Sequence, residues 1–384
     1  MTTTRMGELA DRDRAVAGLP IMISAAQMAR WLSELAIDDH DRQLALQPDY
    51  LRYKPGTSLL VGYRTEDGPL FGYAVSPEAE PKLDKLVRDA PPGSIVGFER
   101  SRRLVLARPA ADRDLPGLRT RLGAGATALA YKPQRRFVGA VDDRILRCYR
   151  RSDLADLLPR WPAGQQISGV RTPVLLETHR RTGSVSVERL PGQRLDQLSG
   201  DRWLAGLEAA GSALARWHRQ APTPRRVSDL PSVETVADQL LQLLPDERAR
   251  IESLAGRLTE LRADLLQTAT VDVGWCHGDF SVDQVLVTDT DEISLLDWDR
   301  SGSGPVAVDL AAADAAGSHG TGGLTGAEWQ ALTAGYQRVR PLPAGLQQFR
   351  AIAHFTRVID PFRSADPDWS RLVRRGLDRV EAML

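Results

Sequence analysis

Acidic and amide side chains gather in two neighbouring stretches, CHGDFSVDQVLV at 276–287 and LLDWDRSG at 295–302. Phosphoryl transfer requires a carboxylate that orients and deprotonates a hydroxyl, and oxygen ligands for the magnesium ion that neutralises the transferred phosphate. Asp279 fits the first role. Gln284 can offer an amide oxygen and Asp297 a carboxylate oxygen, which suits the preference of magnesium for hard oxygen ligands. The two stretches therefore predict a centre for phosphoryl transfer that uses Mg²⁺.

Short apolar runs surround these residues. One precedes His277, a second follows Gln284 up to the turn at 289–291, and a third precedes Asp297. Apolar runs of this length between turn residues predict buried β-strands. Two strand ends then deliver the acidic residues to one place. Either stretch alone is also compatible with an exposed turn, but both in this order favour a catalytic site.

The order of these residues resembles that of the aminoglycoside phosphotransferase and choline kinase superfamily, a branch of the protein-kinase-like fold. Where that superfamily has Asn, this chain has Gln284, which is similar to the maltokinase and actinobacterial glucosamine kinase branch. The run FSVDQ at 280–284 resembles the glucosamine kinases most closely, and the resemblance covers roughly residues 124–384. The matching residues are His277, Gly278, Asp279, Gln284, Asp297 and Asp299.

The resemblance implies an α+β fold with two lobes, in which ATP is the co-substrate. An N-terminal cap is expected over residues 1–120, a β-rich nucleotide-binding lobe over 121–190, and a mostly helical lobe with the catalytic and acceptor site over 191–384. It also implies that His218 is a core histidine and that Asp309 braces the catalytic loop.

The sequence marks the nucleotide-binding residues less clearly than it marks the acidic residues. Gly123 and Gly125 lie in LGAGATALAYK, which lacks the GxGxxG pattern of a phosphate loop. The strand that carries the phosphate-binding lysine in the family has Arg147 here, so the contact comes either from Arg147 or from Lys132 on the adjacent strand. The resemblance places the adenine edge against the backbone of a hinge segment consisting of Glu188, Arg189 and Leu190.

The first 120 residues predict a helix at 24–37, strands within 50–75, a helix at 77–88 and two more strands. Its strand entry LRYKP at 51–55 recurs as LAYKP at 129–133. This recurrence is either chance or the trace of a degenerate copy of the nucleotide-lobe sheet that serves as a cap. Helices are predicted in the last lobe at 203–220, 232–244, 246–268, 306–316, 325–339, 344–358 and 368–383.

Charge and cysteine content bear on location and partners. Lys and Arg total 50, as do Asp and Glu, so nothing indicates a nucleic-acid or membrane partner. The N-terminal segment lacks a signal-peptide apolar core, and no run is long enough to span a membrane. Cys148 and Cys276 lie in apolar segments and are expected to be free thiols in a reducing cytosol. We therefore expect a cytoplasmic protein; its oligomeric state is left open.

The acceptor has to be inferred from charges that the transfer itself does not use. Asp283, Asp299 and Asp360 are candidates, and together they favour a cationic acceptor such as an amino sugar, through charge-assisted hydrogen bonds. A kinase for glucosamine, acting on its 6-hydroxyl, is the first interpretation. A maltokinase or aminoglycoside phosphotransferase is the second, and a non-catalytic pseudokinase is the third. The intact set of Asp279, Gln284 and Asp297 argues against the third.

Overall fold

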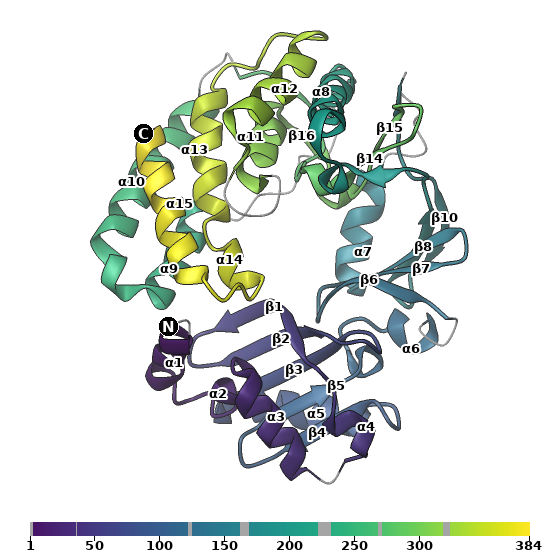
Figure 1. Cartoon of the computed structure of the whole chain (residues 1–384), viewed down its shortest axis with the longest axis vertical. Coiled ribbons are helices and arrows are strands. Elements are labelled where there is room, and N and C mark those ends of the chain that lie inside the picture. The colour runs from purple at the N-terminus through teal and green to yellow at the C-terminus, as the bar shows by residue number, and fades with distance from the viewer. Residues whose placement is uncertain are drawn as a thin grey trace. The chain divides into compact units, whose positions relative to one another are not determined.

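The protein is described here by a computed structural model, which covers residues 3–35, 37–121, 125–161, 169–221, 232–267, 271–317 and 323–384. Its contacts divide it into two compact units. The sheet unit comprises Met1–Ala155, Leu175–Arg189 and Phe362–Trp369, and the helical unit comprises Asp156–Val174, Leu190–Pro361 and Ser370–Leu384. The predicted α+β class is confirmed, with antiparallel sheets and many helices (Figure 1).

The sheet unit contains two five-stranded antiparallel sheets. The cap sheet has the order β1-β2-β3-β5-β4, and the second sheet has the order β6-β7-β8-β11-β10 (Figure 1). The cap-sheet strands are β1 Gln47–Lys54, β2 Ser58–Arg64, β3 Leu70–Val75, β4 Ile95–Glu99 and β5 Leu104–Ala107. The strands of the second sheet are β6 Thr127–Lys132, β7 Arg136–Val141, β8 Arg144–Tyr149, β10 Leu175–His179 and β11 Ser184–Glu188.

The two sheets share their strand plan and their register. In the cap sheet Tyr73 on β3 lies opposite Leu60 and Val105. In the second sheet Arg147 on β8 lies opposite Val138 and Val185. Each sheet begins with three strands that pair in chain order. Two further strands form a hairpin, and the second strand of that hairpin pairs with the third strand of the sheet. The recurrence of LRYKP as LAYKP therefore marks two copies of one structural unit.

A buried carboxylate braces the first hairpin of each copy. Asp13 accepts hydrogen bonds from the Tyr53 hydroxyl (2.7 Å) and the Gly56 amide (2.8 Å). Asp112 accepts the equivalent bonds from the Tyr131 hydroxyl (2.9 Å) and the Gln134 amide (2.7 Å). Burial raises the pKa of Asp112 to about 6, although these hydrogen bonds act in the opposite direction.

One hydrophobic core joins the two sheets. It contains Phe71 and Val105 from the cap sheet, Phe137 and Leu146 from the second sheet, and residues of helix α5 (Glu80–Asp89). The remaining helices of the unit include α1 Thr3–Arg12, α2 Leu19–Met22, α3 Ala25–Glu34, α4 Asp39–Arg42 and α6 Gly117–Arg121. The predicted first helix is confirmed as α3, whose N-cap Ser24 accepts a hydrogen bond from the Gln27 amide.

Seven longer helices form most of the helical unit, close to their predicted positions. They are α8 Gly200–Trp217, α9 Val233–Leu243, α10 Arg248–Gln267, α11 Ala307–Ala316, α12 Gly326–Gln337, α13 Leu346–Arg357 and α15 Trp369–Met383. Helix α8 packs on α12, and α11 packs on α13 (Figure 1). The first pair approaches closely because Gly211 and Gly335 lack side chains: a Cβ at Gly335 would lie 1.8 Å from the Glu208 carbonyl oxygen.

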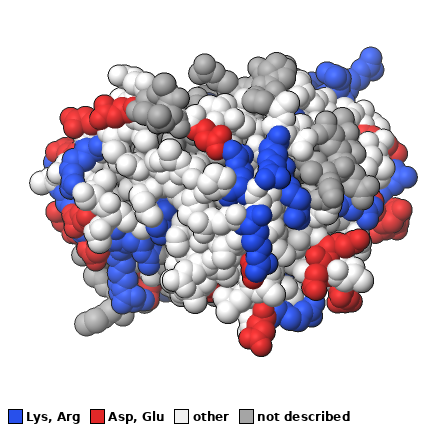
Figure 2. Space-filling view, turned by 90° about the horizontal axis from the view of Figure 1, so that it is seen from above, with Lys and Arg blue, Asp and Glu red and all other residues white. Residues whose placement is uncertain are grey.

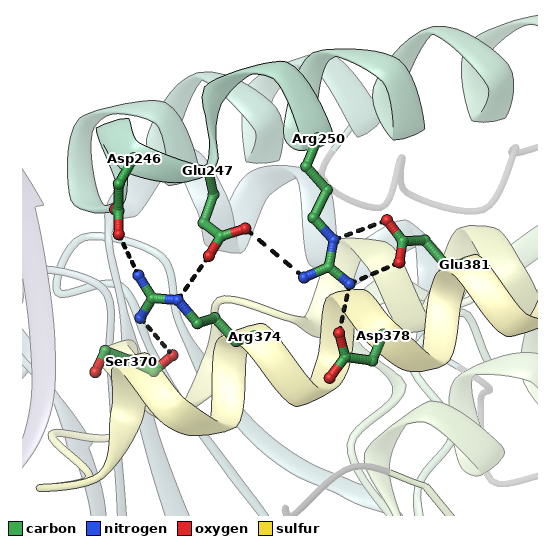
Figure 3. A network of polar contacts seen from close by, with 7 residues as sticks. All are labelled: Asp246, Glu247, Arg250, Ser370, Arg374, Asp378 and Glu381. Carbon is green, nitrogen blue, oxygen red and sulfur yellow. Dashed lines mark hydrogen bonds and ion pairs between the residues drawn. The ribbon is translucent and has the colours of Figure 1, made fainter.

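A network of ion pairs fastens the last helix. Arg374 on α15 contacts Asp246 and Glu247, and Arg250 on α10 contacts Asp378 and Glu381 of α15 (Figure 3). The carboxylate of Glu381, which accepts two hydrogen bonds from Arg250, raises the pKa of that guanidinium. Several members are exposed, so the network contributes through its number of linked charges rather than through any single pair.

Surface charge is mixed on the face drawn in Figure 2, where Lys and Arg side chains are interspersed with Asp and Glu side chains. Among the described residues, no helix is long and apolar enough to cross a membrane.

Candidate active site

The acidic stretches of the sequence lie in the helical unit, where short strands hold them. Strand β13 (Val273–Cys276) pairs with β16 (Gly302–Pro305), and β14 (Val285–Val287) pairs with β15 (Ile293–Leu295). Two two-residue strands, β12 (Gln193–Arg194) and β9 (Val170–Arg171), flank the latter hairpin. The three strands predicted around Asp279 and Asp297 are therefore confirmed.

A fully buried carboxylate fixes the backbone of the predicted catalytic loop, residues 277–284. Asp309 on α11 accepts hydrogen bonds from the amides of His277 (2.6 Å) and Gly278 (2.7 Å). Gly278 has φ 88°, which glycine adopts without strain. The role of Asp309 as a brace is thereby confirmed.

His218 completes the brace from α8. Its Nε2 donates to the Asp309 carboxylate (2.9 Å), and its Nδ1 shares a hydrogen bond with the Tyr336 hydroxyl (2.9 Å). Burial by itself would raise the pKa of Asp309, but the hydrogen bond and charge of His218 hold it below its ordinary value. His218 is buried and contacts Asp309, so its predicted structural role is confirmed.

His277 joins the catalytic loop to the strand end before Asp297. Its ring Nε2 donates to the Leu296 carbonyl (2.6 Å), and the ring packs on Trp298 with centroids 4.6 Å apart. The Leu296 amide in turn donates to the Gln284 carbonyl (2.8 Å). Gln284 and Asp297 therefore lie at the same end of the β14–β15 hairpin. Asp297 adopts a left-handed conformation with φ 64°, which is uncommon for a residue with a side chain.

The side chain of Gln284 fits a metal ligand. Its Oε1 atom is buried and has no hydrogen-bond partner among the described residues. A buried acceptor without a partner is costly, and a bound cation would satisfy it. The described part of the chain holds no group of three or more His, Cys, Asp or Glu side chains placed to bind a metal. Magnesium needs fewer protein ligands when phosphates and water complete its shell.

Two arginines contact the proposed base. Arg357 Nη2 lies 2.7 Å from Asp279 Oδ1, and Arg300 Nη1 lies 3.6 Å from Asp279 Oδ2. The other terminal nitrogen of Arg357 is 3.6 Å from Asp360. Asp279 remains accessible, with 29% of its side chain exposed. Sequence reasoning missed Arg357, because a single arginine at the end of a helix 78 residues after the base gives no local signal.

Helix α13 is held in place for this contact by a second buried carboxylate. Asp314 on α11 accepts from Arg350 Nε (2.7 Å) and contacts His354 Nε2 (2.9 Å), both on α13. Burial opposes ionisation, yet the hydrogen bonds and charges of His354 and Arg350 leave the pKa of Asp314 lowered. One helix, α11, thus positions both the loop brace Asp309 and the helix that ends at Arg357.

The candidate nucleotide residues belong mainly to the sheet unit. Arg147 is buried on β8, a strand with neighbours on both sides, and its guanidinium lies 5.6 Å from the ring centre of Tyr149. Lys132 is on the edge strand β6 and lines a hollow of about 880 Å³ together with Asp49, Arg64 and Arg108. Gly123, of the glycine-containing stretch, lies outside the described residues.

The residues predicted to form a hinge lie where the chain leaves the sheet unit. Glu188 ends β11, and the division between the units falls between Arg189 and Leu190. The Arg189 amide donates to the Asp143 carbonyl (3.2 Å).

A family model described as "Phosphotransferase enzyme family" matches residues 131–342, which is more than half of the chain. The chain belongs to this phosphotransferase family. The matched range includes β7 and β8, the catalytic loop and the brace residue Asp309. No curated protein matches the phosphotransferase.

Several solved structures resemble the phosphotransferase. A choline/ethanolamine kinase family protein from Mesorhizobium loti is 18% identical, with 64% of this chain and 84% of that chain covered and a TM-score of 0.47. An aminoglycoside phosphotransferase from Streptomyces rimosus is 20% identical, with 69% and 96% covered and a TM-score of 0.43. A choline kinase from Streptococcus pneumoniae is 12% identical, with 67% and 93% covered and a TM-score of 0.47. At these values the similarities carry no information on the acceptor.

The three carboxylates predicted for the acceptor occupy different surroundings in the phosphotransferase. Asp360 reaches the base through its ion pair with Arg357. Asp299 is half-buried in the turn after Asp297. Asp283 is exposed and accepts a hydrogen bond from Ser281. The structure thus connects Asp360 to Asp279 through Arg357, and leaves Asp283 at the surface of the loop.

Proposed function

We propose that this phosphotransferase transfers the γ-phosphoryl group of ATP to a hydroxyl of a small acceptor, with Asp279 as the base. The observation that carries the proposal is the braced loop: Asp309 holds the backbone before Asp279, and His277 ties that loop to the end of the hairpin that presents Gln284 and Asp297. A rigid loop of this kind is what positioning a hydroxyl for transfer requires.

A lone pair of the acceptor hydroxyl forms a bond to the γ-phosphorus while the bond from that phosphorus to the β–γ bridging oxygen breaks. The bridging oxygen keeps the electron pair and leaves with ADP, and the hydroxyl proton passes to a carboxylate oxygen of Asp279. Because the transition state of phosphoryl transfer is loose, Asp279 contributes orientation as well as basicity.

Gln284 and Asp297 would hold Mg²⁺. When bound, the ion neutralises charge on the transferred phosphate. The partnerless Oε1 of Gln284 supports this assignment, and the carboxylate of Asp297 is the one anionic ligand that the motif supplies.

For the nucleotide phosphates, the surroundings favour Arg147 over Lys132. Lys132 shares its hollow with Asp49, and its positive charge is one of the factors that lower the pKa of that carboxylate, although burial leaves the pKa raised. Arg147 occupies the strand position that carries the phosphate-binding lysine in the resembling family. Since the Arg189 amide is already hydrogen-bonded to Asp143, the adenine contacts are proposed for the backbone of Glu188 and Leu190.

Glucosamine is the proposed acceptor, and the primary 6-hydroxyl is the proposed site of transfer. The run FSVDQ supports this, as do the carboxylates of Asp299 and Asp360, which can pair with an ammonium group. A site built to bind an ammonium leaves carboxylates unpaired when the substrate carries a hydroxyl or an acetamide, and such mismatches are costly.

The test is a steady-state assay with ATP, Mg²⁺ and a panel of glucosamine, glucose, N-acetylglucosamine, maltose and an aminoglycoside. We expect the highest kcat/KM with glucosamine, by at least about tenfold over glucose. Equal values for glucosamine and glucose, or a higher value for maltose or the aminoglycoside, would transfer the assignment to another acceptor. No transfer to any hydroxyl, with ATP still bound, would instead favour a non-catalytic protein.

A further inference from the structure

Arg357 shares the carboxylate on which the acceptor hydroxyl must dock. Its Nη2 takes one site on Asp279 Oδ1, and Arg300 faces the other oxygen. A carboxylate offers about four lone-pair sites, so the hydroxyl can bind beside the arginines without displacing them. Both guanidiniums remain partly exposed, with 25% of the Arg357 side chain and 31% of the Arg300 side chain accessible.

This arrangement sets the chemistry around the reacting hydroxyl. A hydroxyl in position to give its proton to Asp279 lies about 3 Å from that carboxylate. Because Arg357 contacts the same carboxylate, the substituent next to the reacting hydroxyl has a guanidinium as its neighbour. A guanidinium donates hydrogen bonds and accepts none, so it binds an oxygen there and repels an ammonium.

The charged groups around the reacting hydroxyl do not cancel the repulsion between Arg357 and an ammonium. Arg357 and Arg300 contact Asp279, and Asp360 contacts Arg357. Asp297 and Asp299 belong to the same short turn as Arg300. Asp279 keeps its negative charge, but Arg357, Arg300 and the reacting hydroxyl engage about three of its four lone-pair sites. Asp360 lies on the far terminal nitrogen of Arg357, 3.6 Å away. An ammonium beside the reacting hydroxyl would therefore meet Arg357 before it met Asp360.

We propose that Arg357 is an acceptor-specificity residue, which donates to an oxygen beside the reacting hydroxyl and excludes an ammonium from that place. The inference rests on the proposed function of Asp279. For an amino sugar, it requires the amine to lie far from the reacting hydroxyl. In glucosamine the amine at position 2 is across the ring from the 6-hydroxyl, whereas the 3-hydroxyl is on the carbon next to the one that carries the amine. Arg357 thus accounts for transfer to the 6-hydroxyl.

The experiment uses the full chain with ATP and Mg²⁺, and four acceptors: glucose and its 2-amino, 3-amino and 4-amino deoxy analogues. The amine approaches the 6-hydroxyl along this series. We expect kcat/KM of the wild type to fall from the 2-amino to the 4-amino sugar by about tenfold to 100-fold. Two like charges about 5 Å apart near a protein surface would by themselves produce roughly 250-fold, and the carboxylates of Asp279 and Asp360 offset part of this repulsion. Analysis of the products by phosphorus NMR should place the phosphate at position 6.

Three variants separate specificity from structure. Arg357→Gln should bring the 2-amino to 4-amino ratio to within about threefold of unity, and Arg357→Lys, which keeps the charge, should retain most of the ratio. Arg257→Gln, an exposed arginine on α10, is the matched control and should leave all four values unchanged. Melting temperatures of all variants check the fold.

Outcomes that contradict the proposal are distinct from those that contradict the kinase assignment. If the wild type uses the 4-amino and 2-amino sugars equally well, or if Arg357→Gln keeps the wild-type ratio, the role of Arg357 is refuted while the kinase stands. If the wild type phosphorylates none of the four sugars, nor any other hydroxyl acceptor, the proposed role of Asp279 as the base of a kinase is refuted. The proposed role of Arg357 is then refuted as well.

Discussion

The cap sheet and the second sheet share a strand order, a register and a carboxylate brace, but they differ at one central position. Arg147 of the second sheet stands where the cap sheet has Tyr73, each opposite a pair of equivalent residues on the neighbouring strands. Tyr73 joins the hydrophobic core of the unit. The same framework can therefore be built with or without a charge at its centre, and only the second copy offers a cation there.

Burial separates the two copies further. Every residue of β2 in the cap sheet except Arg64 is buried, whereas most residues of the equivalent strand β7 in the second sheet are half-buried. The cap sheet also carries no second acidic motif like the catalytic loop. We propose that the cap is a structural copy of the nucleotide sheet, and that it shapes the sheet unit without supplying catalytic groups.

The largest effect is expected at the turn before the last strand of each sheet. Gly183 has φ 67°, and a Cβ there would lie 2.4 Å from the Tyr149 carbonyl oxygen; Arg103 holds the equivalent place with φ 48°. Gly183→Ala should lower the free energy of unfolding by roughly 3 kcal/mol through overlap and backbone strain. Arg103→Gly should change it by less than about 1 kcal/mol. Urea denaturation of both variants measures the contrast, and equal losses would contradict the predicted difference between the two turns.

The central position itself gives the second prediction. Arg147→Ala should weaken ATP binding about tenfold to 100-fold, because a charge-assisted contact to phosphate contributes about 1.5–3 kcal/mol. Tyr73→Phe, the matched change in the cap sheet, should leave ATP binding as it is. Calorimetric titration of the two variants with ATP and Mg²⁺ decides the matter, after circular dichroism has shown that both are folded. If Arg147→Ala binds ATP as tightly as the wild type does, the phosphate contact is assigned to Lys132 instead of Arg147.

The carboxylates that brace the first hairpins are expected to have the smallest effect on the free energy of unfolding, and this effect depends on pH. The folded-state pKa of Asp112 is raised to about 6 by burial, so between about pH 4 and pH 6 the folded protein binds more protons at this site than the unfolded chain. Its ionisation therefore lowers stability as the pH rises through this window, by roughly 1–2 kcal/mol after relaxation. Asp112→Asn should remove this part of the pH dependence. We expect the unfolding free energy of the variant, relative to wild type, to rise between pH 4 and pH 7; a flat difference would contradict the assignment.

The sequence predicted those parts of the molecule in which local spacing carries the information. Asp279, Gln284 and Asp297 lie within 19 positions of one another and are flanked by apolar strands, so their convergence on one hairpin end could be expected. The recurring strand entry that contains Tyr53 and Tyr131 indicated the repeat. The carboxylates that brace them could not be foreseen, because Asp13 and Asp112 stand 40 and 19 residues before their partners and no common spacing links the two pairs.

Tertiary contacts determined what the sequence left open. Arg357 differs in no local feature from Arg350 on the same helix, yet the first contacts Asp279 and the second Asp314. The two-residue strands β9 and β12 exist only through pairing with β15 and β14, so no periodicity within them could predict them. Asp283, which the pattern favoured for the acceptor, lies exposed on the loop.

We propose above all the role of Asp279, held by its braced loop, as the base for phosphoryl transfer. Its most direct test is single-turnover transfer of labelled γ-phosphate from ATP to glucosamine by the wild type and by Asp279→Asn, with ATP affinity and melting temperature measured in parallel. We predict that the variant binds ATP and melts as the wild type does, but transfers phosphate about 10²- to 10⁴-fold more slowly. Transfer by the folded variant at close to the wild-type rate would contradict the account.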